Sequence, residues 1–174
     1  MSSIYSLRAK GDDGPDLDLS DFDGDWDELF QNENPIELVT TSPGVSLDLF
    51  MLAGTLGVAS ERLAYSLLDW AGDRLVTRDV SLDGRRFLIL LPGETLNVLD
   101  RDRSDFTVFR SNPDRVKNIR SFVFRTDAIP CSPSVFTIPE SSGRLLLNES
   151  AADRLRGGGY RGLVLEPLRH AYAK

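Results

Sequence analysis

The stretch VFTIPESSGRLLLNESAADRLRGGGYRGLVLEPL, residues 135–168, decides the fold class of this chain. The apolar and β-branched residues at 135–138 and the short apolar run 145–147 predict two strands separated by a Ser-Ser-Gly turn. Asn148 predicts the start of a helix, because its side chain can cap the first free backbone N–H groups, and three consecutive glycines predict the end of that helix. Residues 162–168 predict a further strand, closed by a proline that cannot donate to a neighbouring strand.

An earlier stretch, residues 34–92, repeats this order of elements. Ser60 predicts the start of a second helix, and Gly72 predicts its end. The dipeptide Asp83-Gly84 predicts a tight hairpin turn, because both residue types tolerate a positive φ. Further strands are expected at residues 4–7, 36–39, 75–80, 87–91, 96–99, 106–109 and 119–124.

Together these patterns predict the fold class α+β. We expect one compact domain over residues 1–174, with an acidic loop at 11–30 and two similar strand-helix-strand units at 34–92 and 96–168. The two units are expected to share a mixed or antiparallel sheet, because no low-complexity linker separates them.

Composition limits the compartment and the class of partner. The 174 residues include a single cysteine, Cys131, so no internal disulfide can form, and we interpret this cysteine as a small packed residue in a loop. No apolar run is long enough to cross a bilayer, so we expect a cytoplasmic protein without a membrane partner. Nucleic-acid binding is not expected either, because basic residues are interspersed with acids, as at 101–103.

Residues 11–30 hold nine acidic groups and no lysine or arginine, whereas the whole chain carries −7, so the remaining residues carry +2. Repulsion among these acids predicts a solvated loop. Aromatic side chains among the acids can anchor a protein contact, so we predict a partner-binding surface here. The competing interpretation is that the aromatic residues belong to the core and the acids only aid solubility. The candidate partner-binding residues are Asp21, Phe22, Asp23, Asp25, Trp26, Asp27 and Glu28.

No metal site is predicted, because the chain lacks the clusters of cysteine and histidine that zinc requires. The series Asp21, Asp23 and Asp25 resembles the start of a calcium loop. However, the glycine stands at Gly24 and Trp26 occupies the turn position, which does not match the calcium-loop pattern. We interpret the series as a solvated acidic loop, with weak association of a divalent cation as the alternative.

No catalytic residue and no cofactor is predicted. The only histidine, His170, lies four residues from the end of the sequence, a poor position for a catalytic base. The glycines at 157–162 match GxGxxG, but they follow a predicted helix instead of a strand, so they do not indicate a dinucleotide site. Asp100, Asp102 and Asp105 could pair as catalytic carboxylates, yet the arginines beside them favour surface ion pairs.

Several stretches, taken in their order along the chain, resemble one known family. The resemblance lies in residues 4–7, 34–36, 58–63, 98–104, 123–125, 147–149 and 162–167. These stretches resemble the bacterial polymorphic-toxin immunity proteins of family eleven, which are encoded beside secreted toxins such as type VI or contact-dependent effectors. The chain departs from the family pattern at Asn148, where the family tends to have serine, and at Arg161, where threonine often precedes the glycine.

The resemblance implies a cytoplasmic inhibitor that binds a cognate toxin and blocks it by steric occlusion, and hence a protein that is not an enzyme. It carries over no catalytic residue, and it does not name the toxin. An acidic segment is compatible with steering toward a basic toxin surface, such as a nuclease cleft. Two alternatives stay open: a small enzyme that uses the carboxylates at 100–105, and a chaperone or adaptor that escorts a secreted effector.

Overall fold

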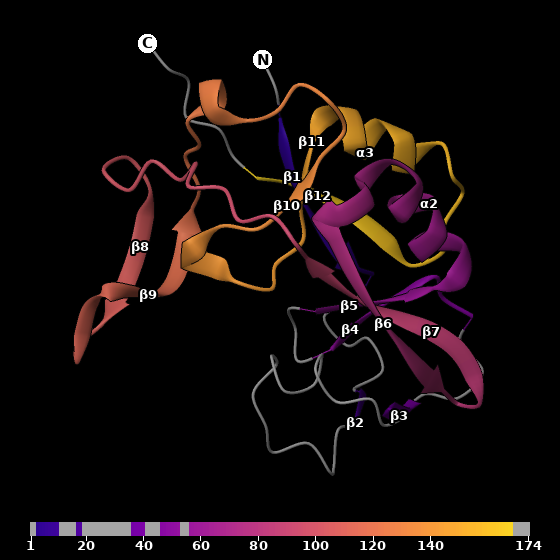
Figure 1. The fold of residues 1–174 in the computed structure, drawn as a ribbon. Helices are drawn as coiled ribbons and strands as arrows, with labels where there is room; N and C mark the ends of the chain where they lie inside the picture. The colour runs from indigo at the N-terminus through magenta and orange to yellow at the C-terminus, as the bar shows by residue number, and fades with distance from the viewer. Residues whose placement is uncertain (1–2, 11–16, 19–35, 41–45, 53–55, 169–174) are drawn as a thin grey trace.

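The computed structural model describes residues 3–10, 17–18, 36–40, 46–52 and 56–168 (Figure 1). The described strands and helices, in chain order, are β1 (Ile4–Ala9), β2 (Leu17–Asp18), β3 (Ile36–Thr40), β4 (Leu49–Leu52), β5 (Leu56–Ser60), α2 (Glu61–Ala71), β6 (Leu75–Leu82), β7 (Arg85–Pro92), β8 (Asp105–Phe109), β9 (Asn112–Ser121), β10 (Val135–Phe136), β11 (Leu146–Asn148), α3 (Glu149–Arg156) and β12 (Leu163–Leu168). Short 3₁₀ helices cover Gly72–Arg74, Thr126–Ala128 and Pro139–Ser141. The predicted class is confirmed: the chain is a single compact α+β domain with mixed and antiparallel sheets.

The two strand-helix-strand units lie on separate sheets instead of sharing one. The strands of the first unit, with β2 of the segment 11–30 at one edge, build a six-stranded sheet in the order β2-β3-β6-β7-β5-β4, in which β3 and β6 run parallel. The second unit builds an antiparallel four-stranded sheet in the order β10-β11-β1-β12. The N-terminal strand β1 lies in the second sheet between β11 and β12, and its residues Ile4, Tyr5, Ser6 and Leu7 are buried.

The local signals of the second unit are confirmed. The Asn148 side chain accepts a hydrogen bond from the backbone N–H of Ala151 at 3.0 Å, which caps α3. The glycines that follow α3 lead into β12, an edge strand that tolerates Pro167. The expected strand at 135–138 is shorter than predicted, because β10 ends at Phe136 and Pro139 opens a 3₁₀ helix.

The first unit also follows its local signals. Ser60 caps α2 by accepting from the backbone N–H of Leu63 at 3.4 Å, and Gly72 ends the helix with a φ of 54°. Asp83 and Gly84 have φ values of 50° and 74°, so the β6–β7 connection is a type I′ hairpin turn. The strand β4 was not predicted from the sequence.

One buried cluster joins the two units although their sheets are separate. It contains side chains of α2, such as Leu63 and Leu67, together with Ala151 and Leu155 of α3. Tyr5 of β1 belongs to the same cluster. Burial of both helices against one core holds the units in a single domain, since apolar burial is the main favourable term in folding.

Two predicted strands differ from the structure. Residues 96–99 form no strand: Leu99 makes an isolated β-bridge with Phe124, and Thr95, just before this stretch, makes one with Thr137. The strand predicted at 119–124 begins earlier and ends earlier, as β9 (Asn112–Ser121), because its residues pair with β8 in a hairpin. The three residues that follow β9 turn inward and are buried.

Other predictions fall at the surface or outside the described residues. The interpretation of Cys131 as a packed residue is wrong: the thiol is exposed, and Ser134 is the residue of this loop that is buried. The acidic residues predicted as partner contacts, and His170, lie outside the described residues. In the part of the chain that the structure describes, no helix has the length and apolar character to cross a membrane.

Candidate functional site

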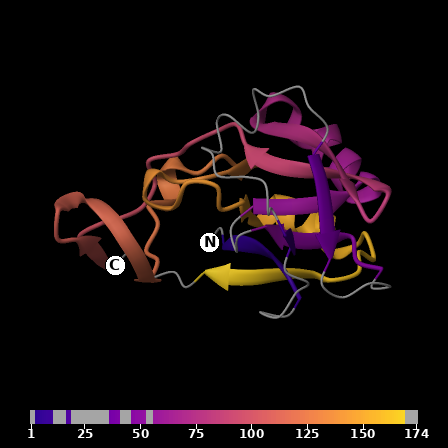
Figure 2. The ribbon, with the colours of Figure 1, turned by 90° about the horizontal axis from the view of Figure 1, so that it is seen from below.

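Strands β8 and β9 form a hairpin that projects from the body of the molecule (Figures 1 and 2). The two strands pair only with each other, and every residue in them is exposed or half-buried. A two-residue turn, Arg110 and Ser111, closes the outer end. A two-stranded hairpin is marginally stable by itself, so its position depends on the contacts that the body supplies at its base.

The hairpin and its flanking residues carry an excess of positive charge. Residues 101–125, called the basic hairpin below, hold seven basic and three acidic side chains, a net charge of +4. Since the whole chain carries −7, the other 149 residues carry −11. The basic side chains are Arg101, Arg103, Arg110, Arg115, Lys117, Arg120 and Arg125.

An irregular register places four apolar residues of the hairpin on one face. Phe106 pairs with Ile119 and Val108 pairs with Val116, with a register shift between the two pairs. Such a β-bulge inserts one extra residue, here Lys117, so that Val116 and Ile119 share a face although they are three positions apart. Ile119 packs against a buried cluster of the body.

Two arginines cover the aromatic rings of β8. The guanidinium of Arg101 lies 5.3 Å from the centre of the Phe106 ring, near the base of the hairpin. The guanidinium of Arg115 lies 5.1 Å from the centre of the Phe109 ring, near the outer end. Both rings stay half-buried under their arginines. Each pair combines a cation with an apolar surface, as in cation–π interactions.

Arg101 also connects the hairpin to the body. Its Nη2 donates to the backbone carbonyl of Asp114 at 3.3 Å, and its Nε lies 3.9 Å from Oε1 of Glu140. The Glu140 side chain is only 8% exposed, whereas that of Arg101 is 43% exposed. The ion pair therefore anchors the base of the hairpin on a buried carboxylate of the neighbouring 3₁₀ helix.

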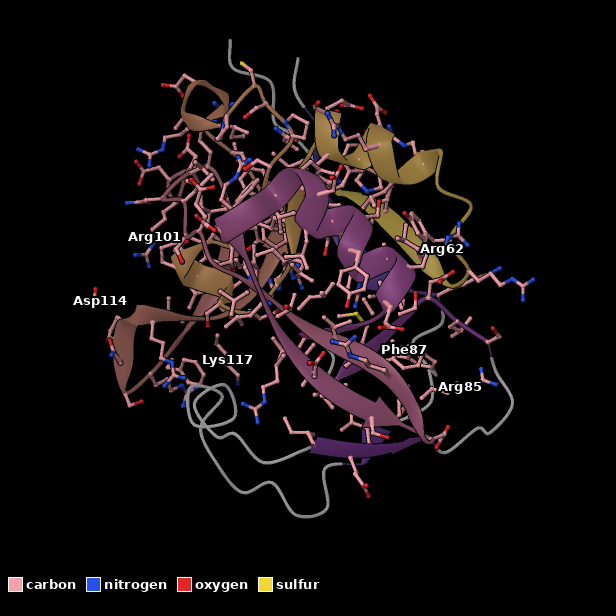
Figure 3. All side chains as sticks on the ribbon, turned by 45° about the vertical axis from the view of Figure 1, so that its right-hand side comes forward. Arg62, Arg85, Phe87, Arg101, Asp114 and Lys117 are labelled. Carbon is pink, nitrogen blue, oxygen red and sulfur yellow. The ribbon has the colours of Figure 1, made fainter. Side chains whose placement is uncertain are left out.

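The other charges of the hairpin face solvent. Arg120 lies 3.9 Å from Asp105, and both side chains are more than half exposed. Arg110 and Lys117 are exposed and have no ion-pair partner among the described residues. In Figure 3, Asp114 and Lys117 lie with Arg101 on the hairpin side of the molecule, away from Arg62 and Arg85.

The carboxylates that the alternative enzyme would use are exposed or half-buried. Asp102 and Asp105 are exposed, and Asp105 faces Arg120. Asp100 accepts a hydrogen bond from the backbone N–H of Arg103 at 3.3 Å, so it stabilises the turn before β8. Within the described ranges, no group of three or more His, Cys, Asp or Glu side chains is placed to hold a metal ion.

A surface cleft of about 260 Å³ lies elsewhere, between α3 and β12. Its lining residues are Leu155, Arg156, Gly159, Tyr160, Leu163 and Leu165. Arg156 already forms ion pairs with Glu149, at 3.4 Å, and with Asp153. The cleft therefore holds a cation whose charge is compensated by its own neighbours.

Glu149, at the start of α3, is held in its charged form. Burial raises the pKa of Glu149, but hydrogen bonds from Ser3 and Tyr5, and from Arg156, outweigh burial and hold that pKa below its usual range. The helix N-terminus also favours a carboxylate there. Glu149 thus stabilises the contact of α3 with β1.

No protein-family model matches this chain, and a search of curated proteins finds no match to it.

The basic hairpin was not predicted as a site from the sequence. A signal was present: residues 110–125 hold five basic side chains and one acid. The Arg-Asp-Arg pattern at 101–103 hid this excess of basic residues, because it suggested that acids compensate the basic side chains along the chain.

Proposed function

We propose that this chain is an immunity protein that binds a cognate secreted toxin in the cytoplasm and neutralises it by steric occlusion, without catalysis of its own. The proposal draws on the resemblance of its ordered stretches to the immunity proteins of family eleven. It also draws on the hairpin, whose shape and side chains suit a protein contact.

The observation that carries the proposal is the projecting hairpin with its two arginine–phenylalanine pairs. Aromatic residues and arginine are enriched at protein interfaces, where a few such side chains supply most of the binding energy. Phe109 and Arg115 lie near the outer end, where a partner meets them first. A hairpin that reaches into the active site of a toxin would block access by substrate.

The test is co-expression with the toxin-like product of the adjoining gene. The wild-type chain should rescue growth and form a complex with the purified, catalytically inactive toxin. Phe109→Ala combined with Arg115→Ala should raise the Kd at least about tenfold, the loss typical of interface anchors. A control, Val76→Ala combined with Arg85→Ala, removes exposed side chains from the β6–β7 hairpin and should leave the Kd within about twofold.

Each alternative predicts a different outcome. Failure of rescue together with failure of binding would contradict the immunity function. A stable complex without rescue would favour the chaperone or adaptor. The carboxylate enzyme would require turnover of a substrate by the purified chain, with loss of turnover in Asp100→Asn or Asp102→Asn.

The acidic segment stays a second predicted contact, through the candidate residues Asp21, Phe22, Asp23, Asp25, Trp26, Asp27 and Glu28. Replacing the aspartates among them by asparagine should slow association in a salt-dependent way if that segment faces a basic toxin surface. Association rates that are unchanged at low salt would remove this segment from the interface.

A further inference from the structure

We infer that the basic hairpin docks into a carboxylate-lined cleft of its partner, so that the blocked toxin surface is acidic instead of basic. The inference rests on the proposed function for the identity of the partner, the toxin, and adds the chemistry of its docking surface. It concerns a different element from the acidic segment, and it assigns the opposite charge to the toxin surface.

Charge separation within the molecule is the first argument. The basic hairpin carries +4 and the other described residues carry −4, so within the part of the chain that the structure describes the hairpin is what an acidic surface attracts. An acidic partner repels the rest of the chain, and this combination orients the encounter with the hairpin leading. A basic partner would instead be drawn to the rest of the molecule.

The shape of the hairpin is the second argument. It projects from the body as a two-stranded element whose residues are all exposed or half-buried (Figure 2). A projecting element of this kind buries the most surface in a concave partner, since only a cleft can contact both of its faces.

The state of the individual charges is the third argument. Arg110 in the outer turn and Lys117 at the bulge have no ion-pair partner in the described part of the chain, so a partner carboxylate need not displace an existing pair. Arg115 lies over the Phe109 ring, which holds its guanidinium group in place for fork-like bonds to carboxylates.

Chemistry limits the class of toxin that offers such a cleft. Glycoside hydrolases place two carboxylates on either side of the scissile bond, and metal-dependent hydrolases hold their ions with carboxylates. In both classes, arginine and lysine side chains that enter the cleft would occupy the positions of substrate or metal. The inference therefore favours a carboxylate-based hydrolase over a toxin with a basic active-site surface.

A charge-reversal pair and a matched control test the inference. Arg110→Glu combined with Lys117→Glu changes two exposed side chains of the hairpin. Arg85→Glu combined with Arg154→Glu changes two exposed side chains of the body and gives the same net charge of −11, since each variant lowers −7 by four units. Circular dichroism and thermal melting should show both variants folded.

The first measurement is the association rate with the inactive toxin at low and high salt. The hairpin variant should associate at least about tenfold more slowly than wild type at low salt, with a smaller difference at high salt, because steering is screened. The body variant should stay within about twofold of wild type. Equal rates for the two variants would overturn the inference and leave the immunity function standing.

The second measurement separates failure of the inference from failure of the proposed function. If the wild-type chain does not bind the toxin, the immunity function is contradicted. Binding to poly-L-glutamate then tests separately whether the hairpin prefers an acidic surface. Wild type and the body variant should bind this polymer at low salt, and the hairpin variant should not. Equal binding by both variants, or tighter binding of a single-stranded DNA of the same charge, would overturn the preference for an acidic protein surface.

Discussion

The guanidinium of Arg101 lies 5.3 Å from the centre of the Phe106 ring, and the same side chain donates to the backbone carbonyl of Asp114 on the opposite strand. Arg101 thus touches both strands of the hairpin from outside it. Its ion pair with Glu140 extends this contact to the body. Arg101 is thus one of the contacts that hold the projecting element in position, beside the packing of Ile119 against the body, and its removal tests how the hairpin is supported.

Arg101→Ala should loosen the hairpin without unfolding the domain. The variant loses the ring contact, the hydrogen bond to Asp114 and the partner of Glu140. Backbone amides of residues 105–121 should exchange with deuterium faster than in wild type, while those of α2 and α3 should not change. Arg110→Ala is the control, because Arg110 has no ion-pair partner among the described residues, and its exchange should match wild type. Identical protection in both variants would show that Arg101 does not support the hairpin.

Asn148 makes more contacts than a helix cap requires. Its Oδ1 accepts from the backbone N–H groups of Ala151, at 3.0 Å, and Ser134, at 3.2 Å. Its Nδ2 donates to the carbonyls of Pro130, at 2.7 Å, and Ser132, at 2.6 Å. The residue is 2% exposed; the two bonds to N–H groups are buried and the two bonds to carbonyl groups are partly buried. The amide therefore joins α3 to the loop that precedes β10.

Asn148→Ala should lower the free energy of unfolding by about 2–4 kcal/mol, from loss of the cap and from buried groups left without partners. Asn148→Ser keeps a capping oxygen but loses the two bonds to carbonyl groups, so it should fall between wild type and the alanine variant. Asn148→Asp places a carboxylate oxygen against two carbonyl oxygens and should regain stability on acidification. Urea denaturation of the three variants measures this order, and an alanine variant as stable as wild type would contradict it.

Glu149 should make stability depend on pH. Its pKa is lowered in the folded state, so its contribution is present above the pKa of the unfolded chain, about 4.3, and is lost as the pH falls through the folded pKa. Glu149→Gln should therefore be less stable than wild type at pH 7, with the difference shrinking toward pH 3. Glu37→Gln, at an exposed position of β3, is the control and should show a small difference. If the loss of stability in Glu149→Gln instead grew on acidification, the pKa of Glu149 would be raised in the folded state and not lowered.

Local signals predicted the elements of this fold, and long-range pairing explains what they missed. Ser60, Asn148 and the Asp83-Gly84 turn act within a few residues, so sequence alone predicted both helices and the hairpin turn correctly. The insertion of β1 between β11 and β12 joins residues 140 or more positions apart. No local pattern encodes such a pairing, so the division into separate sheets was not predicted.

The candidate site was missed for a related reason. A regular strand shows apolar residues at alternate positions, but the bulge at Lys117 puts Val116 and Ile119 on one face at a spacing of three. The strand β9 therefore looked irregular, and only its last part was predicted. Because no hairpin was predicted here, the basic residues at 110–125 did not indicate a single surface. The acidic contact residues predicted instead lie outside the described residues, so that prediction stays untested.

Asp48 joins the two units by both of its carboxylate oxygens. Oδ1 accepts from the Ser60 hydroxyl at 2.7 Å, and Oδ2 accepts from the backbone N–H of Arg161 at 2.8 Å. The Ser60 hydroxyl in turn accepts from the backbone N–H of Leu63, so Asp48 orients the group that caps α2. The carboxylate thus connects the start of α2 with the loop before β12.

Removal of Asp48 should therefore weaken the helix cap as well as the link between units. Asp48→Ala should cost about 1–3 kcal/mol of unfolding free energy, because the Ser60 hydroxyl and the Arg161 N–H both lose a charged acceptor. The effects of Asp48→Ala and Ser60→Ala should not add, with a coupling of about 0.5–3 kcal/mol in a double-mutant cycle measured by urea denaturation. The control is Asp48→Ala combined with Asn148→Ala. The losses of unfolding free energy should add in this double variant, since Asp48 and Asn148 share no hydrogen-bond partner among the bonds described. Additive effects of Asp48 and Ser60 would show that the carboxylate does not orient the cap.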